Sequence, residues 1–417
     1  MASFAGRAAV IPTQPPLKIG IVGAGPAGLA LALLAAKRLP QADITLFDAR
    51  PADKDVSADP RALAMSLGSV QMLQRLGAWP ADRAQPITEV LVSQAPPTLQ
   101  WRGLPAELRL RASDLGVDML GAVLHYGSLV SALQQVWLDA ERQAPQRLHS
   151  RFGAAVRAIN AVDGGQRIEI DAQIAEPFDL AVVAEGGVFA DQARKALSHD
   201  YQQTAWVGQV ALSGATPGLA VERFTRDGPV ALLPLPGTAT NPAEGELLNA
   251  ALVWCIPSND NTLANMDNSQ RIVVLNSRLP PIAGRAVKLS PLKHFALGLN
   301  AERSLVDGRL IRIGNAAQTL HPVAGQGLNL GFRDAYALVL ALREAVPGQT
   351  VDNLLRHMEW SRAADRWSMI ATTDFLARSF TWRWPGMPVL RGLGLAALSM
   401  APPLQRALAR QMMFGQR

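Results

Sequence analysis

The chain has 417 residues, of which 49% are hydrophobic and 18% are charged. This length exceeds one ordinary core, so we expect two interleaved domains, and the apolar content excludes a disordered protein. The net charge is +6, and residues 375–417 hold this whole excess, because they contain no acid and six arginines: Arg378, Arg383, Arg391, Arg406, Arg410 and Arg417.

The single cysteine, Cys255, excludes an intramolecular disulfide and indicates a reducing compartment. We expect this thiol to be buried and structural. Residues 1–16 have one charge and no continuous apolar segment, so we expect a flexible leader and no signal peptide. No stretch reaches the roughly 18 uninterrupted apolar residues of a spanning helix, so we do not expect an integral membrane protein.

The first elements follow a strand, helix and strand pattern. Residues 17–22 and 44–47 are apolar runs, and residues 26–39 between them form a nearly all-apolar helical stretch. This pattern predicts a βαβ unit with a buried parallel sheet. Residues 61–77 have helical spacing and end at a glycine, which predicts a helix there.

The sequence pattern changes at residues 204–254. Strand-like runs alternate there with turns of Gly, Pro and Asn, which predicts an inserted antiparallel sheet. Residues 309–313 read as a return to a buried strand, and residues 325–345 as a long helix. Everything after residue 351 has a helical pattern.

A glycine motif follows the first strand and opens the first helix: Gly23, Ala24, Gly25, Pro26, Ala27 and Gly28. The first glycine permits a tight turn, the second lets the backbone approach a pyrophosphate, and the third allows close packing of helix and strand. The helix N-terminus offers free amides to the phosphates. Asp48, twenty residues beyond Gly28, suits the hydroxyls of an unphosphorylated ribose, hence FAD or NAD and not NADP.

A second glycine-rich loop, residues 314–331, feeds a second long helix. A nicotinamide dehydrogenase does not need this loop, whereas a flavin extends well beyond its nucleotide. The turn from Gly325 to Gly327 would bring amides and a positive helix end against the flavin pyrimidine, which carries negative charge when reduced. The loop therefore favours FAD.

The chain resembles the class A flavoprotein monooxygenases over nearly all residues beyond 16. Within them it is most similar to the ubiquinone-biosynthesis hydroxylases, in the 2-polyprenyl-6-methoxyphenol branch. The segments that carry this resemblance are RALAMS at 61–66, AVERF at 220–224, GPVALLPL at 228–235 and GNAAQTLHPVAGQGLNLGFRDAYAL at 314–338. Asn315 and Gln318 replace the Asp and His of most relatives, a variant typical of that branch.

The resemblance implies an α/β fold, in which a Rossmann-like FAD-binding domain interleaves with an antiparallel-sheet substrate domain before a helical C-terminal region. We expect the leader to cover residues 1–16. The FAD-binding domain would comprise residues 17–85, 120–200 and 297–350. The substrate domain would comprise residues 86–119 and 201–296, and the helical region residues 351–417.

The resemblance also implies roles for single residues. Arg61 would contact the cofactor near its phosphates or ribitol, and Gly314 with Asn315 would hold the ribitol and pyrophosphate. Pro322 would help to position the flavin ring, together with Gly325, Gln326, Gly327, Leu328 and Asn329. His321 is a candidate base, although in this motif it more often braces the loop.

Two positions depart from the pattern of the relatives. Their middle motif reads Ala-Asp-Gly followed by Ser and Arg, whereas this chain has Ala184, Glu185, Gly186 and Gly187, with Arg194 downstream. The longer Glu185 puts the nicotinamide contacts in doubt. Tyr126 replaces an Arg or Asn of many relatives, and we assign it no flavin contact.

The implied reaction is aromatic hydroxylation: NAD(P)H or another donor reduces FAD, O₂ adds at C4a, and one oxygen atom passes to an electron-rich ring. The substrate would be a polyprenylated phenol of ubiquinone biosynthesis, roofed by the sheet at residues 204–254. Trp206, Phe224 and Trp254 are candidates for its wall, though each is equally compatible with plain core. The six histidines lack metal-ligand spacing, so we expect no metal.

Residues 375–417 combine the six arginines with aromatic and methionine side chains. This mixture predicts a peripheral contact with the inner face of the cytoplasmic membrane, and a ubiquinone-biosynthesis complex is a further possible partner. A solvated basic face remains an alternative. The thin spread of charge argues against nucleic acid.

Three other functions stay open. A soluble hydroxylase of small aromatics would share the flavin site. A flavin halogenase is disfavoured, because residues 253–257 match only part of its Trp-x-Trp-x-Ile-Pro signature and Leu252 replaces the first Trp. A non-catalytic flavoprotein in a biosynthetic complex is compatible with the departures at Glu185 and Tyr126.

Overall fold

A six-stranded sheet forms the first layer of the molecule. The structure, a computed structural model, describes residues 16–96, 107–170, 175–185, 195–241, 245–322, 325–346, 348–381 and 387–415. The strand order is β19 (Val306–Asp307), β20 (Leu310–Arg312), β12 (Leu180–Val183), β1 (Lys18–Val22), β2 (Asp43–Asp48) and β8 (Leu148–Phe152). All neighbours are parallel except β19 and β20, which confirms the predicted βαβ start and the return to a buried strand.

The two faces of this sheet are covered differently. Helices α1 (Pro26–Arg38), α3 (Tyr126–Gln143) and α6 (Gly327–Arg343) pack on one face. A three-stranded meander, β9 (Val156–Val162), β10 (Gly165–Ile170) and β11 (Ala175–Phe178), packs on the other. Because both faces are buried, β1 and β2 are almost continuously apolar.

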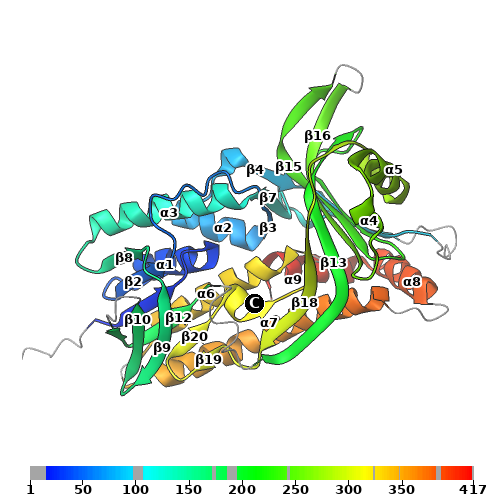
Figure 1. The fold of residues 1–417 in the computed structure, drawn as a ribbon. Helices are drawn as coiled ribbons and strands as arrows, with labels where there is room; N and C mark the ends of the chain where they lie inside the picture. Colours follow the sequence, from blue (N-terminus) through cyan, green and yellow to red (C-terminus); the bar gives the residue numbers. More distant parts are fainter. Residues whose placement is uncertain are drawn as a thin grey trace, which may run out of the picture.

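The second layer is a large curved sheet (Figure 1). Its order is β21 (Gln318–Thr319), β18 (Lys293–Glu302), β13 (Lys195–Ser213), β16 (Gly245–Pro257), β15 (Pro229–Asn241), β14 (Leu219–Phe224), β5 (Glu89–Gln94) and β6 (Glu107–Arg111), and β17 (Arg285–Leu289) also pairs with β13. The pairs are antiparallel apart from β14 with β5. Strand β13 crosses the expected domain boundary at residue 200, where its pairing register with β18 shifts between Asp200 and Gln203.

One predicted helix is partly wrong. Residues 61–77 do not form a single helix: β3 (Ala62–Ser66) pairs with β7 (Gly121–His125), which also pairs with β4 (Ala84–Ile87), and only α2 (Leu67–Leu76) is helical. The apolar positions fit both periods over such a short run, and pairing with β7 selects the strand. Gly77 ends α2 at a φ of +75°, as its position predicts.

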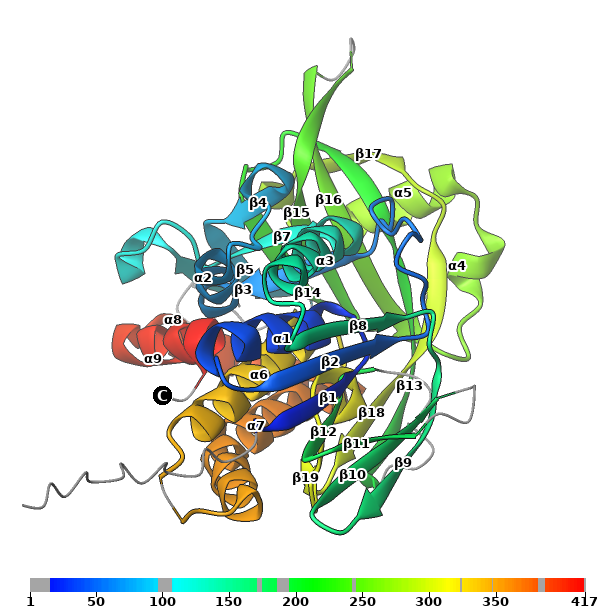
Figure 2. The same cartoon turned by 90° about the vertical axis from the view of Figure 1, so that its left-hand side faces the viewer.

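The remaining elements cover the two faces of the large sheet and form the C-terminal region. On one side α4 (Thr262–Asn265) and α5 (Asn268–Arg278) cover it, and on the other side lie β3, β4 and β7 (Figure 1). The C-terminal helices are α7 (Val351–Thr381), α8 (Met387–Ser399) and α9 (Pro402–Phe414). Helix α7 packs on α6, α8 on β6, and α9 on α2 (Figure 2).

Candidate functional site

The first glycine turn has the geometry of a phosphate-binding loop. Gly23 has a φ of +105°, and its N–H donates to the carbonyl of Phe47 at 2.8 Å. A Cβ at Gly28 would lie 1.9 Å from the carbonyl oxygen of Gly23, so α1 approaches β1 as closely as only glycine allows. Gly25 is the N-cap of α1 and Pro26 its first residue, which leaves the first amides of the helix available to a phosphate.

The carboxylate of Asp48 lies at the end of β2, directly beside this turn. Its Oδ2 accepts the N–H of Ala24 at 2.6 Å, and its Oδ1 accepts the N–H of Arg50 at 2.7 Å. Each carboxylate oxygen can accept a second hydrogen bond, so Asp48 can support the turn and still receive ribose hydroxyls.

Arg50 provides a donor at the same place. Its Nη2 donates to the carbonyl of Ala24 at 3.3 Å, whereas its Nη1 is buried and has no hydrogen-bond partner within the described residues. A buried donor without a partner is costly, and an acceptor atom of a bound nucleotide would satisfy it. These residues therefore fit the adenosine end of a dinucleotide.

Glu185, which follows β12, contacts the turn from the other side. A Cβ at Gly23 would lie 2.9 Å from the Cβ of Glu185. Burial raises the pKa of Glu185, and the negative charge of Asp48 raises it further. The residue thus borders the dinucleotide site. The other members of this middle motif, Gly186, Gly187 and Arg194, lie outside the described residues.

Arg61 and Tyr126 form the edge of the site next to α3. The Arg61 guanidinium stacks on the Tyr126 ring at 3.9 Å and pairs with Asp59 at 2.7 Å. The Tyr126 hydroxyl lies 3.8 Å from the position of a Cβ at Gly25. Tyr126, to which the sequence assigned no contact, therefore borders the phosphate turn. Only the tertiary fold joins these positions, which are a hundred residues apart.

The second glycine loop packs directly on the first. Gly314 has a φ of +59°, and its Cα lies 2.9 Å from where a Cβ at Gly331 would stand. A Cβ at either glycine would also lie about 3.5 Å from the Cβ of Ala27 in α1. The two motifs, separated by some 290 residues, thus form one continuous site. Asn315 is exposed at its edge.

The turn that opens α6 combines several predicted flavin contacts. Gly325 has a φ of +59°, and a Cβ there would lie 3.0 Å from the Cβ of Ala64, whereas a Cβ at Gly327 would meet nothing within 4 Å. Gln326 is buried, and Pro322 and Leu328 are half-buried. Val323 and Ala324 lie outside the described residues.

Asn329 makes its hydrogen bonds to the chain itself. Its Oδ1 accepts from the N–H of Ser66 and the hydroxyl of Ser69, and its Nδ2 donates to the carbonyls of Ala64 and Gly325, all at 2.8–3.0 Å. These four bonds use the full capacity of the amide. The geometry favours a bracing role for Asn329, which ties the flavin loop to β3 and α2, over the predicted contact with the cofactor.

His321 is held in a neutral, buried position. It is 2% exposed, its Nε2 lies 3.1 Å from Gln203 Oε1, and its ring contacts the edge of Tyr201. Burial lowers the pKa of His321 to about 4. Since the amide oxygen of Gln203 is an acceptor, the Nε2–H of the neutral ring donates to it within the protein. This favours the bracing role over the catalytic one.

Two of the three predicted wall residues pack on the face of the large sheet that α4 and α5 cover. Trp206 and Trp254 are cross-strand neighbours that pack in the cluster under α4 and α5, and His294 stacks on Trp206 at 4.7 Å. Side chains alternate along a strand, so the adjacent residues Ala205 and Cys255 face the flavin loop and α7 instead. Phe224 lies on that side, against Leu376 of α7.

Glu222 is a candidate site residue that the sequence pattern did not single out. It lies on β14 between Ala220 and Phe224, on the face toward β7 and α7. Its Oε1 is buried and has no partner in the described part of the chain, and burial raises its pKa to about 8. Burial is the main cause of the raised pKa of the Cys255 thiol, and the negative charge of Glu222 raises it further. The sequence signal that could have identified Glu222 was an acidic residue within a mostly apolar strand, because carboxyl groups are rarely buried without a function or a partner.

Comparisons with known proteins agree with this geometry. A family model described as an FAD binding domain matches residues 172–373, and one described as an NAD(P)-binding Rossmann-like domain matches residues 21–52. The solved structure of Klebsiella pneumoniae HpxO, complexed with FAD and uric acid, superposes with a TM-score of 0.70 over 96% of this chain and 97% of that chain, at 15% identity. The chain therefore contains an FAD-binding domain, FAD is the cofactor, and the fold is that of the class A flavin monooxygenases.

Two relatives of known activity match nearly the whole length of the chain. The 3-demethoxyubiquinol 3-hydroxylase of Escherichia coli (strain K12) is 29% identical over 406 residues, which are 94% of this chain and 97% of that protein. Ubiquinone hydroxylase UbiL of Rhodospirillum rubrum is 28% identical over 414 residues, 94% of this chain and 88% of that protein. This chain is therefore similar to ubiquinone hydroxylases along nearly its whole length.

Proposed function

We propose that the chain hydroxylates the ring of a polyprenylated phenol in ubiquinone biosynthesis, with NAD(P)H or another donor as reductant. The observation that carries the proposal is the inner face of the large sheet. There Ala205, Cys255 and Phe224 are apolar or weakly polar and Glu222 supplies one carboxyl. Such a face suits a neutral ring with one hydroxyl, whereas a small aromatic acid would require a cation.

Different residues would bind different parts of FAD. The amides at the start of α1 would hold the pyrophosphate, Asp48 and Arg50 the adenosine ribose, and the start of α6 the flavin pyrimidine. When bound, FAD supplies electron transfer from the donor and the activation of O₂. The protein orients the ring and excludes water, and His321 and Asn329 keep the loop between the two layers in position.

Glu222 would position the phenol. A protonated carboxyl can donate to the phenol oxygen and accept its proton in turn. The raised pKa keeps the group largely neutral near pH 7, so it can share an apolar space with a long prenyl chain. Above its pKa the carboxylate would draw the phenol proton and make the ring more electron-rich.

The helical C-terminal region would contact the membrane that dissolves such a substrate. Met400 and Leu404 are each 57% exposed, and the exposed Arg406 and Arg410 follow on α9. Exposed apolar and basic side chains together suit an interface with anionic lipid. None of the described helices is long and apolar enough to cross a membrane. Phe380, Trp382 and Trp384, part of the predicted contact, have no described side chains.

Quinone profiling of a strain lacking the gene tests the proposal. We expect ubiquinone to fall and a prenylated intermediate lacking one hydroxyl to accumulate, with recovery on expression of the wild-type chain. Purified enzyme should couple NAD(P)H oxidation to hydroxylation of a prenylated phenol. Unchanged ubiquinone, or efficient turnover of 4-hydroxybenzoate alone, would contradict the proposal.

A further inference from the structure

A groove of about 450 Å³ lies between α1, α2, α6, α7 and α9, at the opposite end of α1 from the phosphate turn. Its part of α1 includes Lys37 and Arg38 in the last turn, whereas the cofactor site lies at Pro26, about 16 Å away along the helix axis. The groove has the size of a small-ligand site, and no role in flavin chemistry accounts for it.

The polar lining of this groove is strongly cationic. Lys37, Arg38, Arg75, Arg333 and Arg362 line it, and no Asp or Glu does. The first three are exposed and make no ion pair with any described residue; Lys37 Nζ donates to the carbonyl of Arg75 at 2.6 Å. Their charges are thus available to an anion.

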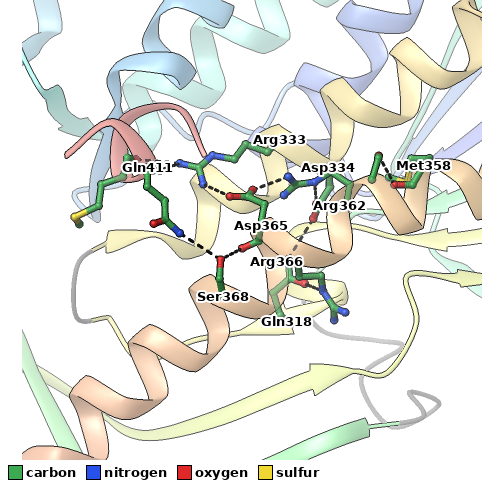
Figure 3. A network of polar contacts seen from close by, with 11 residues as sticks. Gln318, Arg333, Asp334, Met358, Arg362, Asp365, Arg366, Ser368 and Gln411 are labelled. Atoms are coloured by element: carbon green, nitrogen blue, oxygen red, sulfur yellow. Dashed lines mark hydrogen bonds and ion pairs between the residues drawn. The ribbon is translucent and has the colours of Figure 1, made fainter. Parts of the chain in front are cut away.

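Arg362 adds a buried donor to the lining, where α7 meets α6 (Figure 3). Its side chain is 8% exposed; Nε pairs with Asp334 at 2.9 Å and Nη1 with Asp365 at 2.5 Å. Its Nη2 is buried without a hydrogen-bond partner among the described residues. A buried guanidinium nitrogen with an unmade hydrogen bond is costly, and a phosphate oxygen is its best complement.

Arg333 and the C-terminal helix contribute to the same lining. Arg333 pairs with Asp365 at 3.4 Å and donates through Nη2 to the carbonyl of Met412 on α9 at 2.9 Å (Figure 3). The two acids behind Arg333 and Arg362 balance these two cations, so the uncompensated positive charge lies at the rim, on α1 and α2.

Apart from the polar residues Ser66, Ser69, Gln71 and Ser361, the remaining walls are apolar. Leu34, Met72, Leu76, Leu340 and Phe414 line them, and Tyr336 is 40% exposed at their edge. An inorganic anion would leave the apolar walls in contact with water. An acidic peptide would place backbone N–H and C=O groups without hydrogen-bond partners against these walls. An acyl chain covers apolar walls without that cost.

We propose that this groove binds an anionic phospholipid, with the phosphate at the cationic groups and part of an acyl chain along the apolar walls. The lipid would bridge α1, α2 and α6 to α9 and seat the C-terminal region against a membrane. The inference deepens the membrane contact of the proposed function, but its test involves no turnover, so its failure would leave the hydroxylase assignment untouched.

The test uses the full-length FAD-loaded protein and calorimetric titration with dihexanoyl phosphatidylglycerol below its micelle concentration, so that no lipid surface forms. We expect saturable binding, with dihexanoyl phosphatidylcholine and inorganic phosphate each at least about tenfold weaker. The double variant Lys37→Glu with Arg75→Glu should weaken phosphatidylglycerol at least about tenfold, and Ala337→Trp, which fills the groove, should do the same without changing its charge.

Arg83→Glu with Arg142→Glu is the matched control, because both arginines are exposed elsewhere on the surface. This variant should bind phosphatidylglycerol as the wild type does, and flavin absorbance should show that every variant retains its cofactor. Equal affinity for the two lipids, equal loss in the control, or phosphate binding as strong as phosphatidylglycerol would overturn the proposal.

Discussion

His321 and Gln203 join the flavin loop to the large sheet through one hydrogen bond of 3.1 Å inside the core. The bond links the segment before α6 to β13, the strand that crosses the expected domain boundary. Burial lowers the pKa of His321 to about 4, so the imidazole is neutral near pH 7. His321, the one histidine of this motif, thereby connects the segment before α6 to the large sheet.

Acid should destabilise the protein through this residue. The pKa of His321 is lowered in the folded state, so between pH 6.5 and about 4 the unfolded chain binds a proton that the folded chain does not. Stability is therefore lost as the pH falls through this window, by up to about 3 kcal/mol. In His321→Asn this contribution should disappear. Urea unfolding at several pH values measures it, and a constant difference between wild type and variant from pH 7 to 4 would contradict the assignment.

Glu222 should control the pH dependence of hydroxylation. As the pH rises through about 8, the carboxylate forms and can draw the phenol proton, so we expect the wild-type rate of product formation to rise. Glu222→Gln should bind substrate but show no inflection there, and Glu222→Leu should lose about tenfold or more in kcat/KM. Product and NAD(P)H consumption are measured together. An unchanged inflection in Glu222→Gln would exclude Glu222 as its source.

The two faces of the large sheet should separate stability from substrate binding. Trp206→Phe should lower the free energy of unfolding by about 1–3 kcal/mol and leave KM for the prenylated phenol unchanged, because Trp206 packs under α4 and α5. Phe224→Ala, on the opposite face, should raise KM several-fold. Thermal unfolding and steady-state kinetics on both variants test this. A raised KM in Trp206→Phe would place the substrate on the other face.

The phosphate turn should tolerate no side chain at Gly28. Gly28→Ala puts a Cβ 1.9 Å from the Gly23 carbonyl oxygen, so α1 must move and FAD affinity should fall at least about tenfold. Gly394→Ala is the control, since a Cβ at this exposed position in α8 meets nothing within 4 Å. Fluorescence titration of apoprotein with FAD gives both affinities, and equal affinities would exclude the turn as the pyrophosphate site.

The sequence alone determined the cofactor layer. Apolar runs, glycine spacing and the acid after the second strand are local features, and they predicted β1, α1, β2 and the start of α6 to within two or three residues. The loop at residues 314–331 further indicated FAD, because local chain geometry limits what a glycine turn before a helix can bind. These conclusions depend on residues that are near one another in the chain.

The tertiary structure decided which side chains face the cofactor and the substrate. Trp206 and Glu222 lie in strands with the same alternating pattern, and only the packing of α4 and α5 on one side of the sheet buries the first and directs the second inward. Likewise, Asn329 and His321 are polar residues in a flavin motif whose partners, Ser66 and Gln203, are more than a hundred residues away. Spacing along the chain cannot encode such contacts, because they arise only when separate elements pack together.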